Sequence, residues 1–461
     1  MKCIVGNDID VSDPSARVCK WAEENLTIDN PEYIKKTRMG KWVGKTPKKI
    51  YLYERRFGHL ILPFGCLRNL YGAFRSEMDF EADFKPVQKR LYNSGIKLYD
   101  YQENAVQEAL KRKNGIIVMP CGSGKTQTAL ELVSRIGGKC LWLTHTQDLL
   151  NQSMNRAKAC YDIPLSNYGS ITEGKVNVGM ITFATVQTMC RIDLNKYKYE
   201  FDVIVVDECH KCVGSPTNVM MFYKVLSSLS CRYKFGLTAT PKRADGLEKC
   251  MFALLGDIII EVPKEVVEQT TCPVEVQFVE TGYMPNLDVV LAGDGTINYA
   301  SLVDDLTHNE MRFEAVLRLV ERVSQEGATL VLGNRVEFLE RLKTAYKGKC
   351  VCLSSMGNSK RAKEERKDAL AKLNNGELNC IFATYQLAKE GLDVPNLRYV
   401  VFATPEKDET TVTQAAGRVG RKAEMKQKGT VIDFVDSFGM YKGWAKKRRN
   451  IYKKLNFLLT E

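Results

Sequence analysis

The sequence lacks any apolar run of about 18 residues, the length that a membrane-spanning helix requires. Its opening segment, Met1–Asp10, lacks the basic-then-apolar order of a secretory signal peptide. Both absences argue against a membrane-embedded or exported protein. We therefore expect a soluble, intracellular protein of the cytoplasm.

The chain also lacks the paired cysteine motifs of a disulfide scaffold or a zinc site. Its 15 cysteines are odd in number and scattered, and several, such as Cys140 and Cys380, lie in apolar strand-like runs. Reduced and mostly buried thiols are the better interpretation. The one Cys-x-x-Cys pair, Cys209 and Cys212, has no second pair at zinc spacing, so a metal site is not predicted there.

Positive charge is in excess. The sequence has 67 Lys+Arg against 55 Asp+Glu, which gives a formal net charge of +12. Such an excess favours a polyanionic partner or an acidic surface, without identifying which. With 461 residues, the chain is long enough for two or three domains, each with its own core.

Short apolar runs alternate with helix-like segments after residue 97, which predicts parallel sheets covered by helices on both faces. A first series of strands is expected at Gly115–Met119, Cys140–Thr144, Val176–Thr182, Phe201–Val206 and Lys234–Leu237. A second series is expected at Ala328–Leu332, Cys350–Ser354, Asn379–Ala383, Tyr399–Ala403 and Thr430–Phe434. The α/β chain is therefore expected to comprise an accessory domain (1–96), two lobes (97–262 and 263–440) and a basic tail (441–461).

Residues 1–96 do not share this alternation, and their middle part is basic. Between Pro31 and Phe57, aromatic residues are interleaved with Lys35, Lys36, Arg38, Lys41, Lys45, Lys48, Lys49, Arg55 and Arg56. Basic side chains neutralise phosphates, and aromatic rings stack on bases. This segment predicts a DNA-binding appendage; the alternative is a small domain with a solvated basic face.

A glycine-rich segment follows the strand expected at Gly115–Met119 and precedes a helix. It reads Pro120-Cys121-Gly122-Ser123-Gly124-Lys125-Thr126. In this context the backbone N–H groups surround the phosphates of ATP, Lys125 reaches the terminal phosphates, and Thr126 holds Mg²⁺. The strict pattern would have glycine at Met119, so this match alone is incomplete.

Two adjacent carboxylates follow the strand expected at Phe201–Val206. Ligands of parallel sheets bind at the carboxyl ends of the strands, where Asp207 and Glu208 stand. Their chemistry differs: Asp207 is expected to hold Mg²⁺, and Glu208 to polarise the water that attacks ATP. The pair completes the prediction of an ATP hydrolase.

From Leu98 to about Asp436, nearly three quarters of its length, the chain resembles the superfamily 2 helicases of the DExH kind. The resemblance implies two RecA-like lobes that hydrolyse ATP and move on nucleic acid. It implies an adenine contact by Gln102, coupling of hydrolysis to lobe movement by Thr238 and Thr240, and communication between these parts by His210, which could otherwise be an ordinary buried histidine. It also implies nucleic-acid contacts by Thr144 and Thr182.

The second lobe carries the most specific match, Gln414-Ala-Ala-Gly-Arg418-Val-Gly-Arg421. On a helix, Gln414, Arg418 and Arg421 would share one face. An arginine from the facing lobe stabilises charge on the transferring phosphoryl group. We expect Arg421 to be this finger, Arg418 to contact phosphate, and Gln414 to position the γ-phosphate or the water.

The segment Thr384–Asp393 resembles the family's fifth motif. The resemblance implies that Thr384 contacts the nucleic-acid backbone and that Asp393 contacts the ribose of the nucleotide. Beyond the coupling motif, Arg243 and Asp245 make the sequence similar to DNA-directed members: the XPB and RadD groups and phage branch-migration helicases of the UvsW kind. Arg243 is an expected nucleic-acid contact. We therefore expect the substrate to be DNA rather than RNA, in the form of forks or junctions. The protein is expected to bind it as a monomer.

Two other function classes stay open: a translocase that pumps duplex DNA without separating strands, and a non-catalytic, nucleotide-gated binding protein. A strand-displacement assay distinguishes the first, and the presence or absence of ATP hydrolysis the second. Lys125, Glu208 and Arg421 together speak against the second. A small N-terminal domain, two lobes without a long insertion and a basic tail favour a phage or bacterial helicase that acts in replication, recombination or repair.

A strand-separating hairpin is a further expectation. Two β-prone runs, Leu287–Ala292 and Thr296–Ala300, flank Gly293-Asp-Gly295 and predict a hairpin whose Ile297 or Tyr299 stacks on the last base pair. The alternative is that both runs are edge strands of the second sheet. The basic tail, with Tyr441, Trp444 and Tyr452 among its charges, is expected to contact the DNA backbone.

Overall fold

The computed structural model describes residues 1–120, 122–172, 175–216, 218–243, 245–268, 272–293, 295–354, 360–389, 394–423 and 426–460. The chain forms two compact units: Met1–Pro120 with Gly124–Pro263 belongs to the first, and Lys264–Glu461 to the second. No helix within these described ranges is long and apolar enough to cross a membrane.

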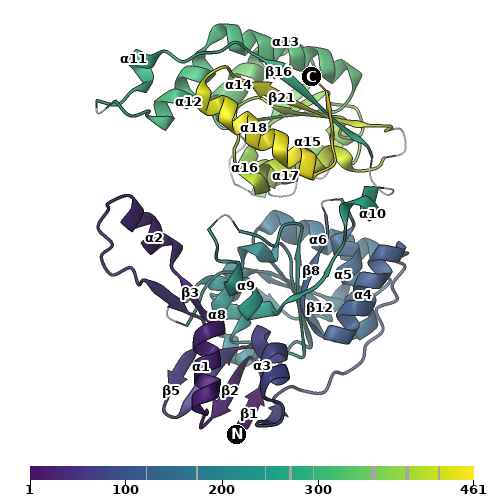
Figure 1. The fold of residues 1–461 in the computed structure, drawn as a ribbon. Coiled ribbons are helices and arrows are strands. Elements are labelled where there is room, and N and C mark those ends of the chain that lie inside the picture. The colour runs from purple at the N-terminus through teal and green to yellow at the C-terminus, as the bar shows by residue number, and fades with distance from the viewer. Residues whose placement is uncertain are drawn as a thin grey trace. The chain divides into compact units, whose positions relative to one another are not determined.

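The first unit begins with a small five-stranded sheet of order β5-β6-β2-β1-β7. Its strands are β1 (Lys2–Val5), β2 (Asp8–Ser12), β5 (Glu54–Arg56), β6 (His59–Pro63) and β7 (Asp79–Ala82). Helices α1 (Ala16–Asn25) and α3 (Leu67–Phe74) lie beside it, in purple and dark blue in Figure 1. A two-stranded ribbon, β3 (Thr27–Asp29) and β4 (Lys49–Tyr51), carries α2 (Pro31–Arg38) at its end.

This N-terminal domain shares a hydrophobic core with the lobe that follows. Cys250 and Ala253 of the lobe belong to the same buried cluster as the domain's own core. Gly65 lies so close to α9 (Glu248–Leu255) that a Cβ there would stand 2.1 Å from the Phe252 carbonyl oxygen. The Lys234 ammonium, fully buried, donates to the Asn7 carbonyl (3.3 Å).

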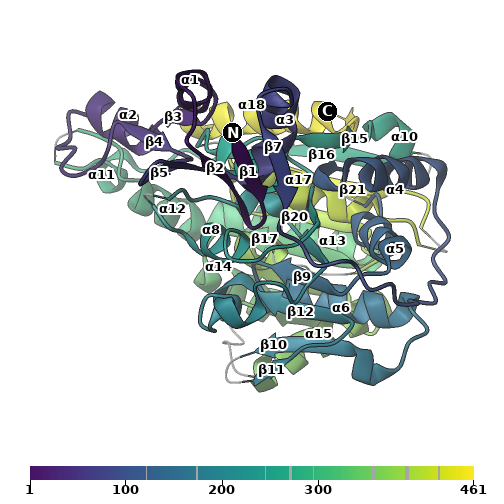
Figure 2. The same ribbon diagram turned by 90° about the horizontal axis from the view of Figure 1, so that it is seen from below.

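The first lobe is an eight-stranded sheet of order β11-β10-β12-β9-β13-β14-β8-β15, and Figure 2 shows β9, β12, β10 and β11 following one another towards one edge. All neighbouring strands are parallel except β10 and β11. The strands are β8 (Asn114–Val118), β9 (Cys140–Thr144), β10 (Tyr168–Thr172), β11 (Lys175–Asn177), β12 (Ile181–Thr185), β13 (Val203–Val206), β14 (Tyr233–Thr238) and β15 (Ile258–Glu261). The run expected as one strand at Val176–Thr182 is thus divided between β11 and β12.

Helices cover both faces of this sheet, as the alternating pattern predicts. One face packs on α4 (Asp100–Arg112), α5 (Lys125–Ile136) and α6 (Gln147–Cys160). The other packs on α7 (Val186–Met189), α8 (Met221–Leu226) and α9, whose apolar side chains join those of the strands in one core.

The second unit is a seven-stranded, wholly parallel sheet of order β18-β19-β17-β20-β21-β16-β22. Its strands are β16 (Val274–Glu280), β17 (Thr329–Gly333), β18 (Cys350–Cys352), β19 (Cys380–Thr384), β20 (Tyr399–Phe402), β21 (Gly429–Val435) and β22 (Leu458–Thr460). Helices α13 (Glu310–Glu326) and α14 (Val336–Ala345) cover one face. Helices α15 (Lys360–Asn374), α16 (Tyr385–Lys389), α17 (Glu409–Gly417) and α18 (Gly439–Lys454) cover the other. The predicted fold class of two α/β lobes is confirmed.

The segment predicted as a basic tail is a structural part of the second lobe, so that prediction is wrong. It forms α18 and then β22, which pairs with β16. Its aromatic residues Tyr441, Trp444 and Tyr452 are buried, and Arg448 is paired inside the lobe with Asp433 through two hydrogen bonds of 2.7 and 2.6 Å. The sequence pattern missed this because a basic helix can still bury a narrow aromatic stripe.

The predicted hairpin arms are also not strands. They form two short helices, α11 (Leu287–Val290) and α12 (Tyr299–His308), and an isolated antiparallel bridge pairs Leu291 with Ile297 between them. Ile297 packs on a small apolar cluster, and the ring of Tyr299 lies 5.7 Å from that of Trp444. Neither the extended wedge nor the edge-strand alternative describes this segment.

The Arg448–Asp433 pair gives a test of the second lobe's stability. Replacing Arg448 by methionine leaves a buried carboxylate without its partner, and we expect this to lower the free energy of unfolding of the lobe by about 3–5 kcal/mol. Lys447→Ala, on the exposed side of the same helix, is the matched control. Chemical denaturation that finds equal stability for both variants would contradict the structural role of the pair.

Candidate functional site

The glycine-rich segment turns into a helix as the sequence predicts. Gly122 and Gly124 have φ angles of 81° and 78°, a left-handed conformation that favours glycine, and α5 begins directly at Lys125. The Lys125 ammonium donates to the carbonyls of Met119 (3.4 Å) and Pro120 (3.3 Å). A helix N-terminus with an adjacent lysine is a site where phosphate groups are stabilised.

Gln102 lies in the first turn of α4 and is buried. Its side-chain oxygen accepts a hydrogen bond from the backbone N–H of Tyr99 (3.0 Å). A Cβ on Gly124 would stand 2.4 Å from the Gln102 side-chain nitrogen, so glycine at 124 makes room for it. The predicted adenine-contacting residue and the phosphate loop are therefore adjacent.

Asp207 and Glu208 lie at the carboxyl end of β13, between β9 and β14 in the sheet. Burial, and then the charge of Glu208, raise the pKa of the Asp207 carboxyl; Lys125 acts in the opposite direction. Ser153 on α6 hydrogen-bonds Asp207, a contact that no motif in the sequence indicates. A buried acid beside a second, partly exposed acid fits a divalent cation, so Asp207 and Thr126 would hold Mg²⁺, which would neutralise phosphate charge.

Glu208 has a left-handed backbone conformation, with φ of 50°, two residues after the end of β13. Burial opposes ionisation of Glu208, but hydrogen bonding by His210 and the charge of Lys125 lower the pKa of this carboxyl overall. An ionised carboxylate is the form that polarises an attacking water.

His210 connects Glu208 to the coupling motif. Its Nδ1 lies 3.3 Å from Glu208 Oε2 and 3.2 Å from the Thr238 hydroxyl. A single Nδ1 proton satisfies only one of these oxygens well at a time, and the hydroxyl of Thr238 itself bonds with the carbonyl and N–H of Thr240. The three predicted coupling residues, His210, Thr238 and Thr240, are thus brought together beside Glu208.

Close packing between β14 and the acidic turn holds these residues in place. Gly236, two residues before Thr238 on β14, lies against Cys209, and a Cβ at 236 would stand 2.7 Å from its sulfur. Cys209 is therefore a packing residue under the acidic turn rather than a metal ligand. Within the described residues, no group of three or more His, Cys, Asp or Glu side chains could hold a metal ion.

Arg243 is placed differently from its predicted role as a nucleic-acid contact. Its guanidinium makes two hydrogen bonds to Asp245, of 2.8 and 2.6 Å, and donates a third to the backbone carbonyl of His210. The geometry favours a structural tie between the segment beyond the coupling motif and the acidic turn. The sequence could not distinguish these roles, because an Arg-x-Asp pattern is consistent with both.

Thr144 and Thr182 are fully buried, and each hydroxyl bonds with nearby backbone, Thr144 with the Thr146 carbonyl and Thr182 with Gly179. Their side chains shape the loops that follow β9 and begin β12, so the prediction that these hydroxyls contact nucleic acid is not supported by their geometry. In the second lobe, Thr384 accepts from the N–H of Leu387 (3.4 Å), while Asp393 lies outside the described residues.

The arginine motif of the second lobe does not form one continuous helix, so the prediction that Arg421 shares a helical face with Gln414 and Arg418 is wrong. Helix α17 ends at Gly417, Arg418 starts a 3₁₀ turn, and Arg421 is extended. Arg418 is buried and donates to the Ala388 carbonyl at the end of α16, whereas Arg421 and Gln414 are partly exposed. The two glycines, Gly417 and Gly420, are the physical reason, since glycine weakens a helix.

Family models match both lobes. The model described as "Type III restriction enzyme, res subunit" matches residues 95–243, and "Helicase conserved C-terminal domain" matches residues 311–423. These ranges contain the phosphate loop, the acidic turn and the arginine motif whose geometry is given above. The chain belongs to the superfamily 2 helicases. It is therefore an ATP-dependent enzyme of the helicase type.

Viral relatives span most of this superfamily 2 helicase. A putative helicase 22 of a Sulfolobus islandicus filamentous virus is 27% identical and covers 86% of the chain and 74% of its own length. The ATP-dependent DNA helicase uvsW of Enterobacteria phage T4 is 24% identical over 94% of the chain and 89% of its own length. The solved structure of Dbp5 from S. cerevisiae, bound to RNA and ADP BeF3, has a TM-score of 0.54 over 79% of the chain and 90% of that protein at 15% identity, which shows the fold alone.

The position of Glu208 generates a prediction. Glu208→Gln keeps the size and burial of the side chain but removes the charge that polarises water, so ATP binding should persist while hydrolysis falls by about 10²–10⁴-fold. Binding by a fluorescent ATP analogue and phosphate release measure the two separately. Glu261→Gln, an exposed acid at the end of β15, is the control, and near-wild-type turnover by Glu208→Gln would reject the assignment.

Proposed function

We propose that this helicase couples ATP hydrolysis to movement on DNA and that it unwinds or remodels branched DNA, such as forks and junctions, in replication, recombination or repair. It acts as a monomer on DNA. The observation that carries the proposal is the contact chain from Glu208 through His210 to Thr238, because it joins the hydrolytic acid to the motif expected to couple hydrolysis to movement.

The preference for DNA rests on two supports. The Leu237–Gly246 stretch resembles that of DNA-directed members, and the T4 relative that spans nearly the whole chain is named a DNA helicase. An RNA helicase is the alternative, since the same fold binds RNA in Dbp5. A duplex translocase that leaves the strands paired is a second alternative, favoured by the restriction-enzyme model that matches the first lobe.

One experiment separates these functions. ATP hydrolysis and strand displacement are measured with forks, four-way junctions, linear duplex and single-stranded DNA, and with RNA of the same sequences. The proposal expects the largest stimulation and clear displacement with branched DNA. Stimulation without displacement on duplex DNA would favour the translocase, RNA-specific stimulation would favour the RNA helicase, and no hydrolysis with any of them would leave a nucleotide-gated binding protein.

Arg421 gives a second test of the catalytic assignment. As the proposed finger, it stabilises charge that develops on the transferring phosphoryl group, so Arg421→Ala should lower the maximal hydrolysis rate by about 10³-fold or more and change ATP affinity much less. Arg322→Ala, on the exposed side of α13 in the same lobe, is the matched control. A loss of ATP affinity with an unchanged bound-state rate would make Arg421 a binding residue instead.

A further inference from the structure

The ribbon that carries α2 is an arm with almost no core of its own. It comprises Thr27–Tyr51: β3, α2, a connecting loop and β4. No residue of α2 is buried, and the arm is held by polar bonds such as those of the Asn30 side chain with the N–H of Glu32 (3.0 Å) and the Pro47 carbonyl (2.9 Å). Figures 1 and 2 both show α2 standing away from α1 and α3. An exposed arm of this kind contributes little to the stability of the fold and is suited to binding a ligand.

The arm carries charge that the protein does not neutralise. It contains seven Lys and Arg residues but only two acids, Asp29 and Glu32. One ion pair joins Lys36 to Glu32 (2.7 Å). The other six basic side chains are exposed and have no ion pair among the described residues: Lys35, Arg38, Lys41, Lys45, Lys48 and Lys49. Uncompensated charge of one sign on an exposed arm favours a polyanionic ligand.

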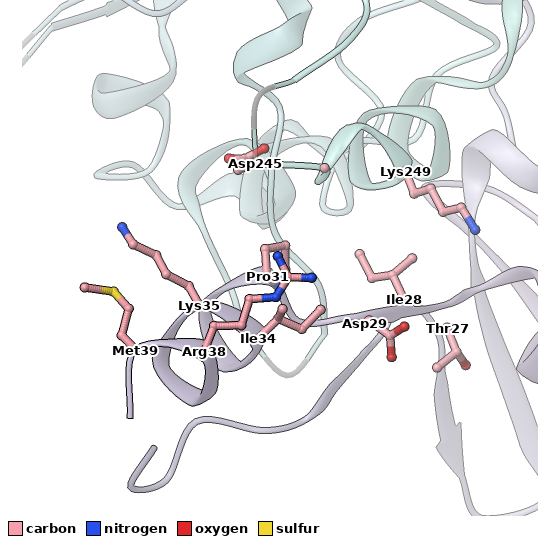
Figure 3. A pocket seen from close by; sticks show the side chains of 11 residues that line it. Thr27, Ile28, Asp29, Pro31, Ile34, Lys35, Arg38, Met39, Asp245 and Lys249 are labelled. Carbon is pink, nitrogen blue, oxygen red and sulfur yellow. The ribbon is translucent and has the colours of Figure 1, made fainter. Parts of the chain in front are cut away.

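A groove of about 730 Å³ lies between this arm and the segment beyond the coupling motif, both in the first unit. Figure 3 shows Lys35 and Arg38 of α2 on one side and Asp245 and Lys249 of the lobe on the other. Apolar side chains, among them Ile34 and Met39, also line it and are exposed by 37% and 55%. Asp29 also lines the groove, whereas Asp245 contributes little free charge because Arg243 is bonded to it. Among the described residues, three cations, Lys35, Arg38 and Lys249, therefore face one acid without such a partner.

We propose that this groove binds single-stranded nucleic acid, with phosphates at Lys35, Arg38 and Lys249 and unpaired bases against Ile34 and Met39. This inference rests on the proposed function, since it assigns part of the nucleic-acid path of the same enzyme. A duplex turns only its phosphates and groove edges to a protein, whereas unpaired bases offer apolar faces that match an apolar lining between cations. Trp42, exposed by 88% beyond α2, is available to stack on a further base.

The groove is also connected by hydrogen bonds to the acidic turn that contains Glu208. Asp245 lines the groove and is bonded to Arg243, which bonds the His210 carbonyl two residues from Glu208. Lys249 lies in the first turn of α9, four residues after Asp245, so a strand held at Lys249 lies beside the segment that is bonded to the acidic turn.

Binding of a labelled oligo-dT and of a blunt DNA duplex to the full-length protein, at several salt concentrations without ATP, tests the proposal. Each lost phosphate contact on a single strand lowers the slope of log K against log[salt] by about 0.7. Lys35→Ala/Arg38→Ala should therefore flatten the slope for oligo-dT by about 1.4, Lys249→Ala by about 0.7, and each should weaken binding on the order of tenfold. Arg68→Ala/Arg75→Ala removes two exposed cations from α3 and its end in the same domain and should change neither quantity.

The outcomes are distinct. Unchanged oligo-dT affinity and slope in both groove variants would overturn the proposal, as would a loss confined to duplex binding, which would make the groove a duplex site. An equal loss in the α3 control would show general charge rather than a site and would also overturn it. If the wild-type protein hydrolyses ATP equally with and without nucleic acid, the proposed function fails, whereas the ATP-free binding experiment still decides the groove.

Discussion

The placement of two adjacent carboxylates at the end of β13 is the constraint on which the rest of the first lobe depends. Asp207 is buried, its neighbour Glu208 is partly so, and an unpaired buried charge is strongly destabilising. The surrounding residues relieve this cost: Lys125 by charge, Ser153 and His210 by hydrogen bonds. If the proposed roles hold, the residues that stabilise the acids are also those that position the reaction, and stability and catalysis depend on the same contacts.

The parallel sheet explains why these residues meet. Strands β8, β14 and β13 are consecutive neighbours, and their carboxyl ends carry the phosphate loop, the coupling motif and the acidic turn respectively. The chain order places these segments far apart, at residues 119–126, 238–240 and 207–210. Only the strand order makes them adjacent, and close packing of Gly236 on Cys209 sets the spacing between two of them.

The sequence predicted the two α/β lobes and many of their strands because strands depend on local patterns. Apolar runs at β9 and β20 begin where they were expected, and the acidic pair follows its strand directly. Predictions failed where tertiary contacts decide. A threonine in a motif, such as Thr144, cannot reveal from sequence whether its hydroxyl faces a ligand or the backbone. The basic residues of α18 concealed the buried Arg448, and the shared core of the N-terminal domain depends on Cys250 and Ala253, which are distant in sequence.

The N-terminal domain has a base that is packed against the first lobe and an arm whose helix, α2, has no buried residue. Its base is anchored by Lys234 on β14 and by α9, the same strand and following helix that flank the coupling motif. The connection between α2 and β4, in contrast, contains no buried side chain. Insertions in a surface connection of this kind cost little free energy, about 0.6 kcal/mol for each doubling of its length. The arm is thus a place where related enzymes could acquire a new reach or a new preference without any change in the hydrolytic machinery.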